Sequence, residues 1–201
     1  MKSTYKKLHG ILAGFFRFVL RVKIKGQENE PSEGPLLICS NHVTLADPIA
    51  ICASLRKIEP HYMAKKELFK VPVLSWIIKI LGAYPVNRGG GDIGAIHKSI
   101  DILKDGGAVG IFPQGTRCKC KRIEDTEFKN GAALICSKVN VPILPIKVDI
   151  NKNKWALFKR INIIIGKPIA PAELIFDSEK PRNEELSRIT KIIFDRIVEL
   201  G

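Results

Sequence analysis

The chain has 201 residues, of which 45% are hydrophobic and 26% are charged. This length fits one domain with a sizeable core, and the composition excludes a disordered chain. The formal net charge of +13 indicates an anionic partner, which could be nucleic acid, an anionic membrane or a phosphorylated substrate.

The first 26 residues contain lysines and arginines but no acidic side chain, and bulky apolar residues lie between them. This mixture predicts a helix, or a bent pair of helices around Gly10 and Gly14, that lies in the membrane interface. A helix packed on the protein's own core is the alternative. No stretch has the ~20 apolar residues of a spanning helix. We therefore expect an N-terminal membrane-associating helical segment over residues 1–26 and an α/β domain over residues 27–201.

The apolar run Leu36–Cys39 predicts a short buried strand. Asp47 and Pro48 predict a helix start, with Asp47 as the N-cap and Pro48 at the first helical position. His42 then lies in a turn between a strand and a helix, where α/β folds place chemistry. In a curled turn the Asp47 carboxylate can meet His42 and make its ring a general base. The alternative is that His42 only fills the turn and Asp47 only caps the helix.

The middle of the chain alternates strand and helix patterns. We expect strands at Pro60–Ala64, Tyr84–Asn87 and Ala108–Phe112, and a broken amphipathic helix over Leu68–Leu81 that belongs either to the membrane surface or to the core. The spacing Gly89-x-Gly91-x-x-Gly94 matches a dinucleotide fingerprint, but Asp92 would place negative charge beside the pyrophosphate. A loop in which Asp92 caps a helix ending at Lys104 is the simpler interpretation.

The last third predicts a helix over Phe128–Lys138, strands at Ile143–Val148 and Asn162–Ile165, and an amphipathic helix over Asn183–Leu200. Strands that alternate with helices are typical of an α/β fold. The sequence therefore predicts a single α/β domain with a mixed or mostly parallel central sheet flanked by helices.

Cysteine usage indicates reduced thiols in a cytosolic setting, because there are five cysteines and no convincing signal peptide. Cys39, Cys52 and Cys136 stand in apolar surroundings typical of core residues. Cys118-x-Cys120 lacks the spacing of a zinc ribbon and has no answering second pair. We expect no metal site.

Four blocks of the chain, in order, resemble the motifs of the glycerolipid acyltransferases, the lysophosphatidic acid acyltransferase (PlsC-like) family. The blocks are Asn41-His42-x4-Asp47, Gly82–Arg88, Phe112–Arg117 and Val141–Pro145. The resemblance spans roughly residues 1 to 170. A single His-x4-Asp is a weak signal, whereas four blocks in the family's order are a specific one.

The resemblance implies transfer of a fatty acyl group from acyl carrier protein or coenzyme A to lysophosphatidic acid, which gives phosphatidic acid and needs no further cofactor. His42 would be the base and Asp47 its orienting group. Arg88 and Arg117 would bind the acceptor phosphate, since guanidinium matches phosphate oxygens, and Gly115 and Thr116 would assist them. No Gly-x-Ser-x-Gly nucleophile elbow occurs, which favours direct attack by the acceptor hydroxyl.

Gln114 departs from the family pattern, which usually has Glu at this place. Gln keeps the size and one acceptor oxygen but loses the charge. If this side chain binds acceptor hydroxyls, affinity should weaken. If its charge is essential, activity or acceptor choice changes.

These observations predict a peripheral enzyme on the cytoplasmic face of the cell membrane, bound to an anionic surface and to a lysophospholipid acceptor. A same-family alternative acts on glycerol 3-phosphate or another lysophospholipid. A non-catalytic membrane lipid-binding protein is a second alternative, motivated by Gln114. A nucleic-acid partner has little support, because no nucleic-acid motif accompanies the basic residues.

Overall fold

The computed structural model describes residues 2–86, 93–118, 122–150 and 160–200. Its strands form one seven-stranded sheet with the order β1-β7-β6-β2-β5-β3-β4. The strands are β1 (Lys23–Lys25), β2 (Leu36–Ser40), β3 (Pro60–Lys65), β4 (Tyr84–Val86), β5 (Ala108–Ile111), β6 (Ile143–Ile150) and β7 (Ile161–Ile165). Neighbouring strands are parallel except β6 and β7, which are antiparallel. The predicted mixed, mostly parallel sheet is confirmed.

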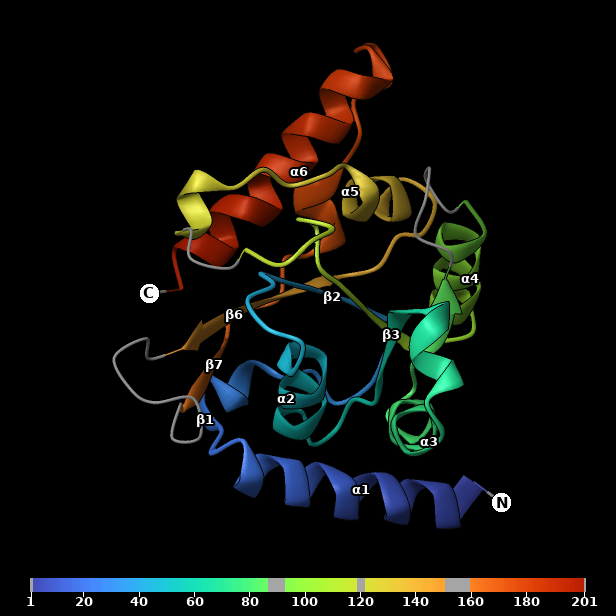
Figure 1. Ribbon diagram of the computed structural model, residues 1–201. Helices are drawn as coiled ribbons and strands as arrows, with labels where there is room; N and C mark the ends of the chain where they lie inside the picture. The colour runs from blue at the N-terminus through green and yellow to red at the C-terminus, as the bar shows by residue number, and fades with distance from the viewer. Residues whose placement is uncertain (1, 87–92, 119–121, 151–159, 201) are drawn as a thin grey trace.

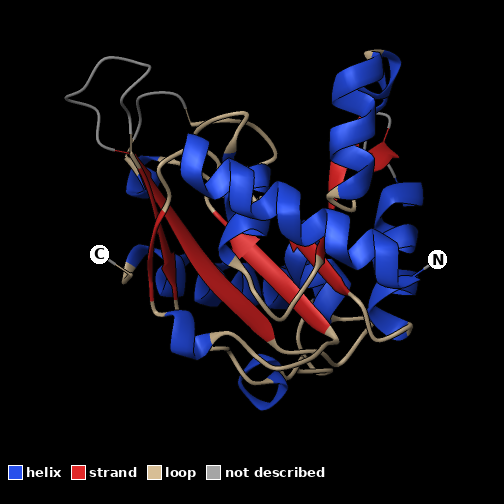
Figure 2. Cartoon of the chain, turned by 90° about the horizontal axis from the view of Figure 1, so that it is seen from below, coloured by secondary structure: helices blue, strands red, loops and turns tan. Residues whose placement is uncertain are grey.

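Helices cover both faces of this sheet. They are α1 (Lys2–Val19), α2 (Asp47–Ser54), α3 (Pro72–Ile80), α4 (Ile93–Lys104), α5 (Gly131–Cys136) and α6 (Arg182–Val198). In Figure 1, α5 and α6 lie above the sheet, whereas α2 lies below it with α1 stretched along its outer side. Seen from below, α1 crosses in front of the strands (Figure 2).

Strand β2 lies at the centre of the sheet and is buried on both faces. Leu36 and Ile38 pack in the core on the side of α2, whereas Leu37 and Cys39 pack in the core on the side of α5 and α6. Successive side chains of a strand point to opposite faces, so a strand covered on both sides needs an unbroken apolar run. The position of β2 places the residues that follow it at the middle of the sheet's carboxyl edge.

Helix α1 is continuous, which is the first of the two arrangements expected for this segment. Two local features differ from the sequence-based expectations. Strand β1, which the sequence did not predict, pairs in parallel with β7 at the edge of the sheet. Helix α2 starts at Asp47 with Ala46 at the N-cap position, so the prediction that Asp47 caps the helix was wrong. The Asp47 carboxylate instead accepts hydrogen bonds from residues of the turn that precedes the helix.

The predicted break within Leu68–Leu81 is confirmed, since a 3-10 turn over Lys66–Lys70 precedes α3. The loop Gly89–Gly94 and the proposed Asp92 cap fall largely outside the described residues. Among the helices of the described ranges, none is both long and apolar enough to cross a bilayer.

Candidate active site

The turn after β2 brings His42 and Asp47 into contact. Nδ1 of His42 lies 2.8 Å from Oδ2 of Asp47, and the two side chains are 8% and 0% exposed. Because an ionised carboxylate only accepts hydrogen bonds, Nδ1 carries the proton and the lone pair is on Nε2. Nε2 has no hydrogen-bond partner within the described part of the chain. The pair therefore has the arrangement of a base and its orienting group.

The Asp47 carboxylate also folds the turn. Oδ2 accepts the backbone N–H groups of Val43 at 2.6 Å and Thr44 at 2.8 Å, and Oδ1 accepts the Thr44 hydroxyl at 2.6 Å. These donors stabilise a buried negative charge that would otherwise be costly. They also explain why two residues five positions apart meet here, as a curled turn allows.

The segment after β5 holds the other side of His42. The His42 ring stacks on the Phe112 ring, and the two ring centroids are 4.2 Å apart. Its backbone N–H donates to Oε1 of Gln114 at 2.7 Å, and its carbonyl accepts the Cys118 N–H at 2.7 Å. Strands β2 and β5 are parallel neighbours, so both of their carboxyl ends reach the same edge of the sheet. The first and third motifs thus meet at His42.

The remaining predicted site residues differ in how far they are buried. Gly115 adopts a left-handed backbone with φ of 67°, in a turn closed by its N–H and the Phe112 carbonyl. Thr116 and Arg117 are exposed beside it. Gln114 is only 4% exposed, and both ends of its amide bond to protein groups. Arg88 lies outside the described residues, so its predicted role stays a prediction.

An apolar cavity of about 310 Å³ adjoins the turn that holds His42 and Asp47. Leu45 and Ala46, which stand between His42 and Asp47, form part of its wall, and Leu45 is largely exposed. The cavity is further lined by Pro48, Ile49 and Cys52 of α2, by Tyr62, Met63 and Ala64 of β3, and by Leu74 and Ile78 of α3. These elements are distant in sequence, and their apolar patterns do not distinguish a cavity wall from filled core.

The cavity wall includes a cysteine, Cys52. Burial raises the pKa of Cys52 to about 12, so the thiol in the cavity wall stays protonated near neutral pH. No group of His, Cys, Asp and Glu side chains in the part of the chain that the structure describes could hold a metal ion.

Sequence comparisons find relatives along most of the chain. A family model described as Acyltransferase matches residues 21–149. The 1-acyl-sn-glycerol-3-phosphate acyltransferase of Bacillus subtilis is 33% identical over 89% of this chain and 87% of its own length. The chloroplastic 1-acyl-sn-glycerol-3-phosphate acyltransferase BAT2 of Brassica napus is 27% identical over 90% of this chain, which spans only 56% of that longer protein.

A solved structure has the same fold. The crystal structure of the 1-acyl-sn-glycerophosphate (LPA) acyltransferase PlsC from Thermotoga maritima superposes with a TM-score of 0.71. The match covers 100% of this chain and 83% of that protein at 22% sequence identity. At this identity the similarity establishes the shared architecture.

Proposed function

We propose a reaction for this chain from the premise that it belongs to the acyltransferase family, as its four motifs predicted. The chain transfers a fatty acyl group from a thioester of acyl carrier protein or coenzyme A to the free hydroxyl of 1-acylglycerol 3-phosphate, and the product is phosphatidic acid. The observation that carries this proposal is the buried His42–Asp47 pair, 2.8 Å apart, beside an apolar cavity. The names of the relatives support this acceptor.

His42 acts as the general base. Nε2 takes the proton of the acceptor hydroxyl while the oxygen attacks the thioester carbonyl carbon. The tetrahedral intermediate collapses, the carbon–sulfur bond breaks, and the thiolate takes the proton back from the imidazolium. Asp47 holds the ring tautomer and stabilises its positive charge. General-base catalysis of this kind contributes roughly 10²- to 10⁴-fold.

The cavity binds the acyl chain of the donor. Its wall is apolar, and each buried methylene contributes about 0.8 kcal/mol of transfer free energy. Because its rim is at Leu45 and Ala46, a chain inserted there places its carbonyl end near His42.

The acceptor phosphate binds at the loop after β5. Arg117 is exposed there, and its planar guanidinium can donate two parallel hydrogen bonds to phosphate oxygens. The left-handed turn at Gly115 lets the backbone approach the ligand, and Thr116 adds a hydroxyl. Arg88, which follows β4 in the sequence, is proposed as the second phosphate-binding cation.

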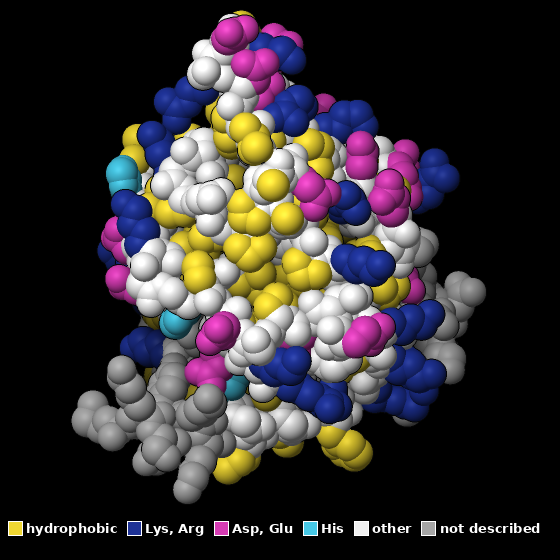
Figure 3. Space-filling model, turned by 180° about the vertical axis from the view of Figure 1, so that it is seen from behind, with side chains coloured by type: hydrophobic (Ala, Val, Ile, Leu, Met, Phe, Trp, Pro, Cys, Tyr) yellow, Lys and Arg dark blue, Asp and Glu magenta, His cyan; other side chains and the backbone are white. Residues whose placement is uncertain are grey.

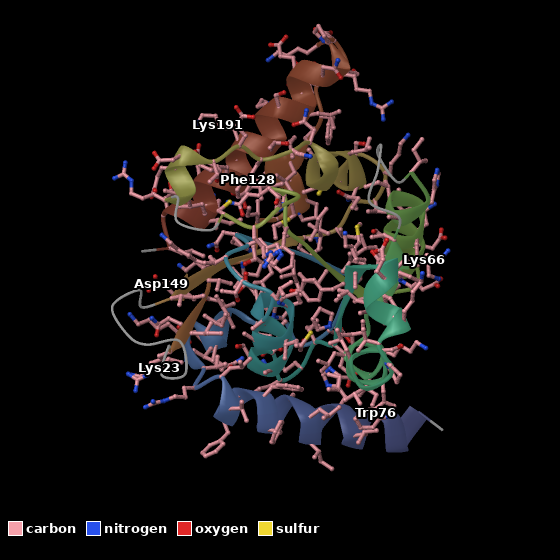
Figure 4. All side chains as sticks on the ribbon, in the orientation of Figure 1. Lys23, Lys66, Trp76, Phe128, Asp149 and Lys191 are labelled. Atoms are coloured by element: carbon pink, nitrogen blue, oxygen red, sulfur yellow. The ribbon has the colours of Figure 1, made fainter. Side chains whose placement is uncertain are left out.

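The α1 side of the molecule docks on the anionic, cytoplasmic face of the membrane. Phe18 of α1 is 84% exposed, and Ile11 and Phe15 are also largely exposed. Helix α3, which contacts α1, adds exposed Val73 and Trp76 (Figure 4). Hydrophobic side chains project from the lower edge in Figure 3, where α1 lies, and Lys and Arg gather beside them. Such a surface suits anionic lipid.

An acyl-transfer assay tests the proposal. Purified wild type, His42→Ala and the control His61→Ala are supplied with acyl-coenzyme A or acyl carrier protein thioester and with lysophosphatidic acid, glycerol 3-phosphate or lysophosphatidylcholine. His42→Ala is expected to lose at least about 100-fold in turnover, whereas His61→Ala stays near wild type. Equal activity of all three would remove His42 as the base. Inactivity of all three together with vesicle binding would instead support a non-catalytic lipid-binding protein.

A further inference from the structure

Three hydrogen bonds in series run from the backbone of His42 into the loop after β5. The His42 N–H donates to Gln114 Oε1 at 2.7 Å. Gln114 Nε2 donates to the Thr126 hydroxyl oxygen at 2.8 Å, and the Thr126 hydroxyl donates to the Ile123 carbonyl at 2.6 Å. Gln114 is 4% exposed, so its amide depends on these protein partners.

The direction of every bond in this series is fixed by its two ends. A backbone N–H can only donate, so the Gln114 atom that faces His42 is the oxygen. The amide nitrogen then faces Thr126, whose oxygen must accept. The single hydroxyl hydrogen of Thr126 is thereby left for the Ile123 carbonyl, which can only accept. The series is fully satisfied when residue 114 accepts at one end and donates at the other.

We infer that Gln114 is a positioning residue for His42 and that Thr126 is the partner that requires an amide at position 114. This inference rests on the proposed function, in which His42 is the base. The backbone of His42 is held at its N–H by Gln114 and at its carbonyl by Cys118, so the series fixes where the ring stands relative to Asp47 and the cavity. Gln114 accordingly acts through His42 and does not bind the acceptor.

A carboxylate at position 114 does not satisfy the same groups. Both of its oxygens accept, so the one hydrogen of Thr126 would have to serve either the carboxylate or the Ile123 carbonyl. If the hydrogen goes to the carboxylate, the Ile123 carbonyl keeps the Thr126 backbone N–H at 3.1 Å, but the Thr126 hydroxyl oxygen then faces it at 2.6 Å with no hydrogen between them. When the carboxyl group is protonated, however, it again accepts with one oxygen and donates with the other, as the amide does.

The first test removes the hydroxyl of Thr126. Thr126→Val keeps the shape but breaks the series, and Thr126→Ser keeps the hydroxyl. Thr190→Val is the matched control, because Thr190 donates to Asn130 at 2.9 Å in a contact that does not reach His42. Thr126→Val is expected to lower kcat by about 3- to 10-fold, the effect of one net hydrogen bond, with KM for lysophosphatidic acid unchanged. Thr126→Ser and Thr190→Val should keep the wild-type kcat.

The second test uses Gln114→Glu and the pH. Among the described residues, the charged or titratable groups of these segments are His42 and Asp47 on the turn after β2, Arg117 and Cys118 on the same loop, and Arg122, Glu124, Asp125, Glu127 and Lys129 around Thr126. Burial at this position, which is 4% exposed, should raise the pKa of the new carboxyl above its usual ~4.3. The variant-to-wild-type ratio of kcat should therefore rise toward one as the pH falls.

Amide hydrogen exchange at His42 gives a readout that does not need turnover. Exchange should become faster in Thr126→Val and stay unchanged in Thr190→Val. The inference is overturned if Thr126→Val keeps both kcat and the exchange rate, if it raises KM alone, or if the Gln114→Glu ratio is flat with pH. An inactive wild type would count against the proposed function only, because the exchange comparison still decides whether Thr126 and Gln114 hold His42. If Gln114→Glu does not fold, the Thr126 variants decide.

Discussion

Asp47 uses its two carboxylate oxygens for two different tasks. Oδ2 accepts from the His42 ring and from two backbone N–H groups, whereas Oδ1 accepts from the Thr44 hydroxyl. One side chain therefore both folds the turn and orients the proposed base. The contact is local, so the spacing of the sequence was sufficient to predict that the two residues could meet.

The substitution Asp47→Asn removes the negative charge of this side chain while keeping its size. The amide nitrogen cannot accept, and the neutral group cannot stabilise an imidazolium, so we expect kcat to fall at least about 100-fold. The melting temperature should fall as well, because buried donors of the turn lose an acceptor. The control is Asp101→Asn on the exposed side of α4, which should match wild type. Turnover of Asp47→Asn within about twofold of wild type would contradict the role of the carboxylate.

At the scale of elements, α6 is attached at its start by a buried carboxylate. Glu185 is 1% exposed, accepts from Arg188 at 2.8 Å and accepts the Asp177 N–H at 2.9 Å. The hydrogen bond from Arg188 and that backbone N–H lower the pKa of Glu185 to about 2. Helix α6 packs its apolar side on the core beside β2. The contacts of Glu185 therefore help to stabilise the layer of helices on that face of the sheet.

The lowered pKa of Glu185 predicts an acid-dependent loss of stability. A carboxyl with a folded-state pKa below its unfolded value stabilises the fold fully above about 4.5, and this contribution is lost as the pH falls toward 2. Glu185→Gln should therefore melt lower than wild type at pH 7, and the difference should shrink as the pH falls over this range. The comparison is by calorimetry, with exposed Glu184→Gln as the control. A difference that stays constant with pH would contradict the prediction.

Helix α1 should bind membranes through its exposed aromatic side chains. Burying a Phe side chain contributes about 1.5–3 kcal/mol, so Phe15→Ser with Phe18→Ser should weaken binding to anionic vesicles by at least 10-fold. Sedimentation with vesicles measures this, and the same variant should keep its melting temperature because both rings are exposed. Ile175→Ser removes an exposed apolar residue near the start of α6 and should bind like wild type. Equal binding of all three proteins would exclude α1 as the membrane surface.

At the scale of the whole molecule, the apolar cavity arises where α2, β3 and α3 meet, on the side that α1 covers. Both of these helices, α2 and α3, contact α1. The proposed acyl site and the proposed membrane surface therefore lie on the same side of the sheet. An acyl chain could thus pass from the lipid phase to His42 without crossing the sheet.

Filling this cavity should change the preferred acyl length. Ala64→Phe adds a ring to the wall, so the ratio of kcat/KM for palmitoyl over decanoyl donors should fall about 10-fold, which corresponds to roughly two fewer buried methylenes. Exposed Ala170→Phe serves as the control and should leave the ratio unchanged. A ratio that does not move in Ala64→Phe would place the acyl chain elsewhere.

The sequence by itself determined the family, the α/β class and the turn in which His42 and Asp47 meet. The motifs are contiguous, the alternation of strands and helices is periodic, and His42 and Asp47 meet within a single turn. It did not predict β1, because three residues with two exposed lysines carry no periodic signal. The predicted catalytic and substrate-binding roles all remain predictions: those of His42, Asp47, Arg88, Gln114, Gly115, Thr116 and Arg117.

Only the tertiary structure decided what surrounds the turn. Gln114 reaches the His42 backbone across 72 positions, and the Asn41 side chain pairs with the backbone of Val148 across 107. These contacts exist because β2 lies between β5 and β6, so that segments distant in the chain end at one edge of the sheet. Strand order depends on the packing of all layers together, and the local pattern of each segment does not specify it. For that reason the sequence left Gln114 as a substrate-binding candidate and gave no sign of its hydrogen bond to the His42 backbone.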